Sequence, residues 1–448
     1  AQEFVGISVL EEKNLSDEAL IGLARRQINK DFGLRQENVL MPDVALESTG
    51  GVIRDGLTTG YLAKRRRFHL IGQKGVSMRG IERILLGLGH KVTGSDLSSG
   101  GHSAGNITSK LDAVVYTSAA TRRDAPGQVE IETARKLKIP CLKRSRFIAA
   151  LVGVNQLIAV SGMHGKSTVA SMVAHILTYC GFDPSYLIGV PDTVPKNGYV
   201  GGAKLGEGNI FVVEACEYDR SFHDFRADVA VITNIEEEHL DYFTGGFKEI
   251  EEAFSEFIGF AKPAATIVAP AIDDSMKRVI ATSRKTRTDV RFITSLDEYE
   301  LQKDLDKAEY LFFGKHNFSN AALAAAAVKR FGITAKEAWL ALRTFKGARR
   351  RLEYIGSFND AIIYDDYGHH PTEIKTDIVS LKEKFPKSRL TLVFQPHQAS
   401  RTKDFFEEFV RTLKEADNVI VTDIYNVAGR EQDENVSSEM LVKAITEE

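Results

Sequence analysis

Glycine, lysine and hydroxyl residues lie close together in the stretch GMHGKST, residues 162–168, directly after the apolar run LIAV. A strand, a glycine turn and a helix in this order place free backbone N–H groups and the positive end of a helix dipole where an anion binds. Lys166 would supply a charge for terminal phosphates, and Ser167 or Thr168 would offer a hydroxyl to Mg²⁺. The stretch therefore predicts a nucleotide-phosphate site, although Val160 stands where the full pattern G-x-x-x-x-G-K-[ST] has glycine. The alternative is a helix start that contains Gly-Lys-Ser by chance.

Acidic residues follow two further strand-like runs. Glu214 ends the run FVVEA, and Asn234, Glu238, His239 and Asp241 follow VAVITNI. Ligands of open α/β sheets bind beyond the carboxyl ends of the strands, so these side chains are candidates for a site. Phosphate-bound Mg²⁺ needs only one or two protein oxygens. Imidazole suits softer metals, and His239 taken alone is more often a surface or core histidine.

The last third of the chain is richest in candidate residues. The stretch KGARRRLE carries Arg349, Arg350 and Arg351, any of which could stabilise a transferring phosphoryl group. Polar residues also follow the runs AIIY and LTLVFQP: Asp365, Asp366, Tyr367, His369 and His370 after the first, and His397 and Arg401 after the second. We expect these clusters to line a cleft rather than to pack in a core.

Composition restricts the class of protein. A chain of 448 residues allows about three domains, and its apolar (43%) and charged (27%) fractions are those of a soluble globular protein. The net charge of −3 gives no general attraction to nucleic acid or membranes, so neither is an expected partner. Cys141, Cys180 and Cys216 show no metal-ligand or disulfide spacing. Without an 18-residue apolar run or a signal-like N-terminus, the sequence predicts a cytoplasmic protein.

The elements that position these residues alternate between strand-like and helical patterns from Phe68 onward. We predict an α/β fold with a Rossmann-like N-terminal domain at 68–155 and a central P-loop-type ATPase domain with a mostly parallel sheet at 156–314. A Rossmann-like C-terminal α/β domain would occupy 315–448. Residues 1–67 form a leader of unknown role, with one helical pattern between Ser16 and Gly33.

Taken together and in this order, the motifs resemble the Mur ligase superfamily, and within it most closely the members that add L-alanine to UDP-N-acetylmuramate. The matching stretches are HLIG, TGSD, TSAA, GMHGKST, VVEACEYD, TNIEEEHLD, KHNFSNAALAAAA, RRRLE, DDYGHHPTEI and FQPHQASRT. The resemblance covers roughly residues 68–448 and implies a UDP-substrate domain, an ATPase domain and an amino-acid-binding domain. It implies ATP and Mg²⁺ as cofactors, UDP-N-acetylmuramate and L-alanine as substrates, an acyl-phosphate intermediate, and a role in peptidoglycan precursor synthesis.

The resemblance also assigns roles to residues. For ATP it implies Gly162, His164, Gly165, Lys166, Ser167, Thr168, His316, Asn317, Asn320, Arg351, Asp365 and Asp366. For Mg²⁺ it implies Ser167, Glu214 and His239; for the amino acid, Tyr367, His369, His397 and Arg401; and for the UDP substrate, Gly72, Gly75, Ser95, Asp96 and Ser118. The residues expected to take part in catalysis are Lys166, Glu214, His239, Arg351 and His369.

Some positions depart from the family pattern. The turn GQKGVSMRG has Lys74 and Ser77 where glycine is expected, Cys216 replaces a common Asp, and Gln398 replaces a common Arg. Two alternatives therefore stay open: a ligase that attaches a ready-made tripeptide to the same nucleotide sugar, and a nucleotide-binding homologue without ligase activity. The sequence leaves open whether the protein is a monomer or a homodimer.

Overall fold

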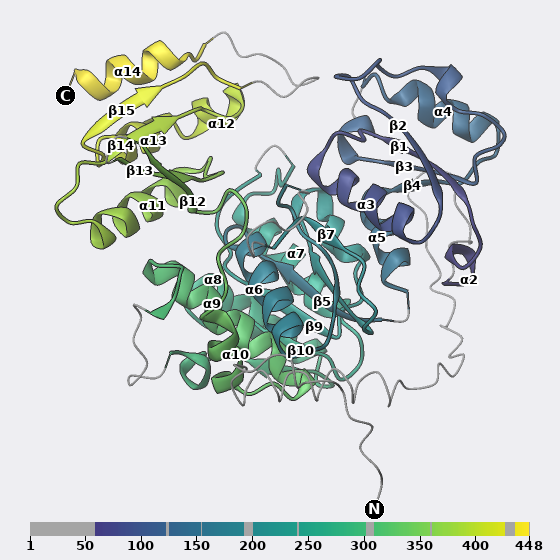
Figure 1. Cartoon of the computed structure of the whole chain (residues 1–448), viewed down its shortest axis with the longest axis horizontal. Helices are drawn as coiled ribbons and strands as arrows, with labels where there is room; N and C mark the ends of the chain where they lie inside the picture. The colour runs from purple at the N-terminus through teal and green to yellow at the C-terminus, as the bar shows by residue number, and fades with distance from the viewer. Residues whose placement is uncertain are drawn as a thin grey trace, which may run out of the picture.

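The computed structural model describes residues 59–121, 125–153, 155–191, 200–239, 242–301, 309–358, 361–425 and 435–447. Most of the predicted leader, including the helix predicted between residues 16 and 33, lies outside the described residues, as does Asp241. Figure 1 shows three groups of elements along the chain: an N-terminal sheet with its helices, a large central sheet, and a C-terminal group that ends in α14.

The N-terminal domain is a parallel sheet of order β2-β1-β3-β4. Its strands are β1 (Arg67–Ile71), β2 (Lys91–Ser95), β3 (Ala113–Tyr116) and β4 (Cys141–Lys143), and its helices are α2 (Thr59–Leu62), α3 (Val76–Gly87), α4 (Gln128–Lys136) and α5 (Arg144–Val152). Because β1 is central and the chain leaves it first to one side and then to the other, the carboxyl end of β1 is a topological switch point. Ligands of such sheets bind there.

The central domain is built on a seven-stranded sheet of order β11-β10-β9-β5-β8-β6-β7. Its strands are β5 (Gln156–Ser161), β6 (Ser185–Leu187), β7 (Ala203–Lys204), β8 (Ile210–Glu214), β9 (Val229–Ile232), β10 (Thr266–Val268) and β11 (Arg291–Ile293). All neighbouring pairs are parallel except β6 with β7. The helices α6 (Lys166–Tyr179), α7 (Phe247–Gly259) and α8 (Asp274–Thr286) alternate with these strands. Strands β5, β8 and β9 are almost wholly buried, as their apolar runs predict.

Two helices that the sequence placed in the third domain pack on the central one. The helix α9 (Lys315–Val328) lies against α6, and α10 (Ala335–Leu342) contacts both. Every residue from Ala321 to Val328 is buried in the same core as the apolar side chains of α6. The small alanine side chains of α9 allow this close approach, and we therefore propose that the central domain extends past the predicted limit at residue 314 to the end of α10.

The C-terminal domain contains an antiparallel pair, β12 (Glu353–Phe358) with β13 (Ala361–Asp365), and a parallel pair, β14 (Thr391–Phe394) with β15 (Asn418–Val421). Its helices are α11 (Pro371–Lys384), α12 (Ala399–Asp404), α13 (Phe406–Leu413) and α14 (Ser438–Thr446). A separate small core joins α11, α13 and α14 to β14. The predicted fold class, α/β with mostly parallel sheets, is confirmed. Within the described residues, no helix combines the length and apolar character needed to cross a bilayer.

Candidate active site

The glycine turn between β5 and α6 has the backbone that its sequence predicts. Gly162 has φ +127°, and a side chain there would collide with Thr233. Gly165 has φ +80°, caps α6, and leaves room for Asn320 of α9. Only glycine adopts such conformations readily and lets neighbouring groups approach the backbone. The segment that follows β9 holds this turn in place, because the backbone N–H of His164 donates to Asn234 Oδ1 at 2.9 Å.

Lys166 lies beside this turn and is surrounded by oxygen atoms. Its Nζ donates to the carbonyls of Gly162 (2.5 Å) and Met163 (2.8 Å) and pairs with the Glu217 carboxylate at 3.1 Å. Burial alone would lower the pKa of Lys166, but the negative charge of Glu217 and its neighbours raises it above its ordinary value. The ammonium group is therefore charged at neutral pH and available to a phosphate.

Three potential metal ligands converge next to Lys166. Ligand atoms of Glu217, Glu238 and His239 all lie within 4.8 Å of one another. His239 Nε2 is 3.2 Å from Glu217 Oε1, and both carboxylates are buried. Two carboxylate oxygens beside a phosphate turn fit Mg²⁺, which takes few protein ligands and completes its shell with water and phosphate oxygens. The donor set thus fits the cation implied by the resemblance.

Glu214, which was predicted to bind the metal, contributes negative charge that raises the pKa of Lys166 and of Arg351. Its Oε2 accepts the backbone N–H of Gly189 at 2.7 Å, and it does not belong to the group of three ligands. Glu217 takes the place beside His239. Glu217 is the third residue after β8 and the N-cap of the 3-10 turn Tyr218–Asp224, and its carboxylate accepts a hydrogen bond from Lys166 Nζ. The sequence feature that could have indicated Glu217 was the second acidic residue of the stretch EACEYD.

Cys216 and Gln398, which depart from the family pattern, lie at the edges of this site. Burial and the charge of Glu217 raise the pKa of Cys216 to about 12, so the thiol is neutral at pH 7. Gln398 has φ +73°, and its backbone N–H donates to the carbonyl of Tyr425 at 2.9 Å. A residue other than glycine in this conformation marks a strained turn between β14 and α12.

The C-terminal domain reaches the glycine turn through charged side chains. Arg351 Nη2 lies 3.5 Å from Ser167 Oγ, and its Nη1 lies 3.6 Å from Glu373 Oε1. Glu373, in the first turn of α11, also contacts His164 Nδ1 at 3.2 Å. Burial opposes the charge of His164, but Glu236 and Glu373 raise its pKa to about 9. A positively charged imidazole thus links the phosphate turn to α11.

Four residues predicted to bind the amino acid gather at the ends of β13 and β14. The rings of Tyr367, His369 and His397 lie 5.2–6.1 Å apart. Arg401 Nη2 is 3.3 Å from Glu238 Oε1, which joins this group to the candidate metal ligands. Burial lowers the pKa of His369, so this ring is neutral at pH 7. The group therefore combines aromatic rings with a guanidinium, the kinds of side chain that bind a small polar substrate.

The residues predicted near the adenosine lie on both sides of the turn. Asn320 faces Gly165, and its Nδ2 lies 3.4 Å from the Oδ1 of the buried Asn317. Burial lowers the pKa of His316 to about 4. Asp366 accepts the backbone N–H of Leu352 at 2.6 Å and that of Gly368. Asp365 lies 3.4 Å from Arg350 Nε. Thr168 lies buried one residue beyond Ser167.

The residues predicted for the UDP substrate lie at the switch point of the N-terminal sheet. Gly72 ends β1 with φ +83°, and its N–H donates to the carbonyl of Ser95 at 2.9 Å. Gly75 caps α3, and Asp96 accepts the backbone N–H of Lys74 at 3.2 Å. Ser118 follows β3. The structure therefore brings these residues to one end of the sheet.

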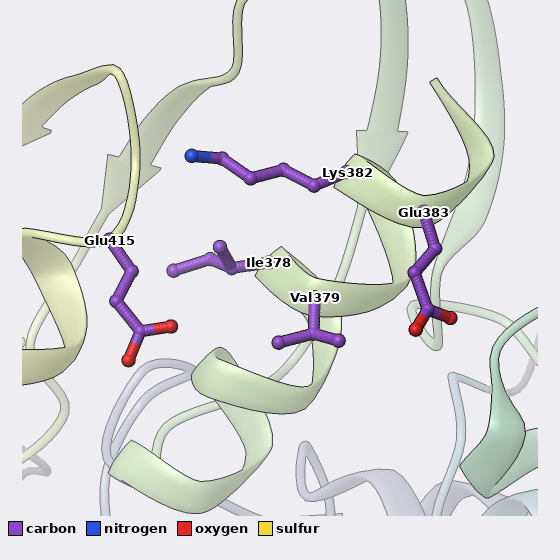
Figure 2. Close-up of a pocket in the computed structure, with 5 residues that line it drawn as sticks. All are labelled: Ile378, Val379, Lys382, Glu383 and Glu415. Carbon is purple, nitrogen blue, oxygen red and sulfur yellow. The ribbon is translucent and has the colours of Figure 1, made fainter. Parts of the chain in front are cut away.

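A shallow hollow on the C-terminal domain lies outside this arrangement. Figure 2 shows its lining, Ile378, Val379, Lys382, Glu383 and Glu415, which come from the second half of α11 and the turn just after α13. None of these residues was predicted to bind a substrate. The candidate site begins instead at the opposite end of α11, where Glu373 meets His164.

Comparison with known proteins agrees with this geometry. Family models match most of the chain: "Mur ligase family, catalytic domain" at 67–155, "Mur ligase middle domain" at 160–328 and "Mur ligase, glutamate ligase domain" at 350–448. The chain belongs to the Mur ligase family. The Mur ligase of Aquifex aeolicus named UDP-N-acetylmuramate–L-alanine ligase is 38% identical over 391 residues, which are 80% of this chain and 84% of the relative. The protein of the same name from Geobacter sulfurreducens is 34% identical over 85% of this chain and 87% of its own.

Solved Mur ligase structures share the fold. The UDP-N-acetylmuramate–alanine ligase of Thermotoga maritima superposes with a TM-score of 0.66 at 22% identity, over 85% of this chain and 88% of that one. A murein peptide ligase from Psychrobacter arcticus gives a TM-score of 0.61 at 24% identity, over 80% of this chain and 84% of that one. These similarities support the architecture of the Mur ligases for this chain.

Proposed function

We propose that this Mur ligase is an ATP-dependent amide-bond-forming enzyme that joins L-alanine to the lactyl carboxylate of UDP-N-acetylmuramate, in peptidoglycan precursor synthesis. The relatives described above carry this activity in their names, at 34% and 38% identity over most of their length. The observation that carries the proposal is the convergence of Lys166, the Glu217–Glu238–His239 group and Arg401 at one place. A site for the phosphates of ATP and a binding partner for the carboxylate of L-alanine would then lie next to each other.

The first step activates the carboxylate, because a free carboxylate is a poor acyl donor. A lactyl oxygen attacks the γ-phosphorus of ATP, the bond to the leaving ADP breaks, and an acyl phosphate forms. Lys166 and the N-terminus of α6 hold the phosphate oxygens, and Arg351 reaches them from the C-terminal domain. Mg²⁺ bound by Glu217, Glu238 and His239 would add charge neutralisation at the same oxygens.

The second step forms the amide. The amine of L-alanine attacks the acyl carbon, phosphate leaves, and the amine proton passes to solvent or to a base in the site. Arg401 is the partner we assign to the alanine carboxylate, because its guanidinium carries the positive charge that acts on His369 of the aromatic group and lies 3.3 Å from Glu238. Most of the rate comes from holding the two reactants in position. Contact of the C-terminal domain with the glycine turn would exclude water and protect the acyl phosphate.

The remaining expectations extend this proposal. Ser167 would add a hydroxyl to the metal site, and His316, Asn317 and Asn320 would contact the adenosine. Gly72, Gly75, Ser95, Asp96 and Ser118 would bind the uridine end of the nucleotide sugar. The enzyme would work in the cytoplasm, as a monomer or a homodimer, without nucleic acid or membrane partners.

A turnover assay tests the proposed function. Phosphate release is measured with UDP-N-acetylmuramate, ATP and Mg²⁺, together with L-alanine, glycine, L-serine or the tripeptide of the peptidoglycan stem. We expect release with L-alanine to exceed release with the tripeptide by at least about tenfold, since the relatives at 34% and 38% identity are named for L-alanine. Release with the tripeptide alone would replace the proposal by the recycling ligase. ATP binding without turnover on any substrate would indicate a homologue without ligase activity.

A further inference from the structure

A buried carboxylate lies at the switch-point end of the N-terminal sheet. Glu130, in the first turn of α4, is 0% exposed. Its donors come from three separate segments. They are Ser95 Oγ (2.6 Å), His102 Nδ1 (3.0 Å), Ser103 N (3.2 Å) and Asn106 Nδ2 (2.6 Å), with His69 Nε2 at 3.8 Å. None of the roles predicted from the sequence uses Glu130.

The carboxylate is ionised although it is buried. Burial disfavours its charge, but the nearby His69 ring and hydrogen bonds from Ser95, Asn106 and His102 lower the pKa of Glu130 to about 2. A buried anion is stable only while its donors stay in place, because each displaced donor leaves charge unsatisfied. Charge-assisted hydrogen bonds are also shorter and stronger than neutral ones. Glu130 therefore fixes the positions of the groups around it.

Ser95 connects this cluster to the glycine turn after β1. Its hydroxyl donates to Glu130, while its carbonyl accepts the backbone N–H groups of Gly72 (2.9 Å) and Gln73 (3.0 Å). Gly72 has φ +83° and lies against Thr117, so the turn has little freedom to shift by itself. A movement of Ser95 is thus transmitted directly to the backbone N–H groups at the start of α3.

The segment from Ser95 to Asn106 is held by the same carboxylate at both ends. Ser95 binds one oxygen of Glu130, and Ser103 and Asn106 bind the other. Between these anchors, Asp96 accepts the backbone N–H of Lys74. The two strand-end segments that border the switch point, 72–75 and 95–106, therefore depend on one side chain that lies behind them.

We propose that Glu130 is a positioning residue for the nucleotide-sugar substrate, holding the 72–75 turn and the 95–106 segment in the geometry that binds the uridine diphosphate. The inference rests on the proposed function, which assigns these segments to that substrate. Glu130 is covered by its donors and does not touch the substrate. Its loss should weaken substrate binding and leave chemistry at Lys166, in the central domain, unchanged at saturation.

Steady-state kinetics of Glu130→Gln tests this role. The amide keeps the shape but loses the charge and turns an N–H₂ group toward donors. We expect KM for UDP-N-acetylmuramate to rise by about tenfold or more, while kcat and the KM values for ATP and L-alanine stay within about twofold. Asn106→Ala removes one donor and keeps the buried charge, so it should fold and raise the same KM by about threefold. If Glu130→Gln does not fold, the KM of Asn106→Ala for UDP-N-acetylmuramate decides whether Glu130 has the positioning role.

Asp112→Asn is the matched control. Asp112 lies in the same domain but at the opposite end of β1, where it accepts the N–H of Arg67 (2.8 Å) and binds Arg66 Nη1 (3.0 Å). It should lower stability without changing any KM. Equal losses of activity in all three variants, or an unchanged KM for the nucleotide sugar in both test variants, would overturn the inference.

Calorimetry with UDP alone separates this inference from the proposed function. If the wild-type protein shows no turnover but binds UDP, the proposed function is wrong, and about tenfold weaker UDP binding by Glu130→Gln still supports the positioning role. Wild-type protein that does not bind UDP would overturn the inference, because no site would then exist for Glu130 to position.

Discussion

Lys166 and Glu217 form the pair on which the nucleotide site depends. With Glu217 at 3.1 Å and two carbonyl oxygens close by, the ammonium is held in the turn before any phosphate arrives. An incoming triphosphate would take over part of this coordination, and Glu217 would then be free to bind the cation beside His239.

Substitution of the two candidate metal carboxylates distinguishes their roles. Glu217→Gln should raise the Mg²⁺ concentration needed for half-maximal turnover by about tenfold or more, because it removes a buried charge from the group of three ligands. Glu214→Gln should have a smaller effect, since the amide oxygen can still accept the N–H of Gly189. Titration of turnover with Mg²⁺ checks both. A larger shift in Glu214→Gln would restore the assignment made from the sequence.

The sequence predicted part of this site and missed part for a physical reason. Gly162, Gly165 and Lys166 follow a simple order of strand, turn and helix, so local sequence was sufficient to place them. Glu217 was not among the predicted residues because it lies in the irregular segment between β8 and the 3-10 turn Tyr218–Asp224, where no periodic pattern indicates which side chain faces Lys166.

At the scale of elements, α11 connects the two domains that must meet around the nucleotide. His370 caps this helix with its side chain, and Pro371 occupies the first turn, so the helix begins at a fixed point. Glu373 then lies in reach of both His164 and Arg351. The order of strand, glycine turn and helix predicted around GMHGKST matches α6. The sequence analysis did not identify α11, although Pro371 in its first turn, the i, i+4 pair Ile374 and Ile378, and Lys382 and Lys384 in its last turn are helix signals.

The His164–Glu373 contact predicts a pH dependence of stability. The folded pKa of His164, about 9, lies above its ordinary value of 6.5. The stabilisation is therefore complete below pH 6.5 and lost as the pH rises through about 9, with an upper bound of roughly 3 kcal/mol. Thermal unfolding between pH 6 and 10 should show this loss in the wild type and a smaller one in Glu373→Gln.

Glu383→Gln, on the same helix, is the control for this effect. Glu383 pairs at 3.2 Å with Lys315 on the exposed surface, where ion pairs contribute little. The thermal stability of Glu383→Gln should therefore depend on pH in the same way as that of the wild type. An identical pH profile in Glu373→Gln would show that the contact with α11 does not set the charge of His164.

At the scale of the whole molecule, the domains differ in how they are joined. The N-terminal and central domains share one continuous apolar core, with Gly80 of α3 placed closely against Ala203 and Leu187. The C-terminal domain has its own core and meets the central one through the charged contacts described above. In Figure 1 it lies above α9 and α10, which cover the central sheet. The packing of α9 and α10 on α6 joins segments that are far apart in the sequence, so a local sequence pattern does not reveal it. The domain limit predicted at residue 314 therefore lies between α6 and the two helices that share its core.

Two truncated chains test the limit that the packing favours. A chain that ends at residue 346 keeps α9 and α10 and should unfold cooperatively. A chain that ends at 314 exposes the buried surface of α6, since Ala321–Val328 and Trp339 are lost from its core, and it should aggregate or lack a thermal transition. Circular dichroism during heating shows whether each chain has a cooperative thermal transition. Such a transition in the chain that ends at residue 314 would favour the domain limit predicted from the sequence.

The most direct test of the account follows an oxygen atom. If ATP activates the lactyl carboxylate as an acyl phosphate, one carboxylate oxygen leaves with the released phosphate in each turnover. With UDP-N-acetylmuramate labelled with ¹⁸O in the carboxylate, mass spectrometry should find one labelled oxygen in the phosphate for each amide formed with L-alanine. Amide formation with unlabelled phosphate would contradict the account.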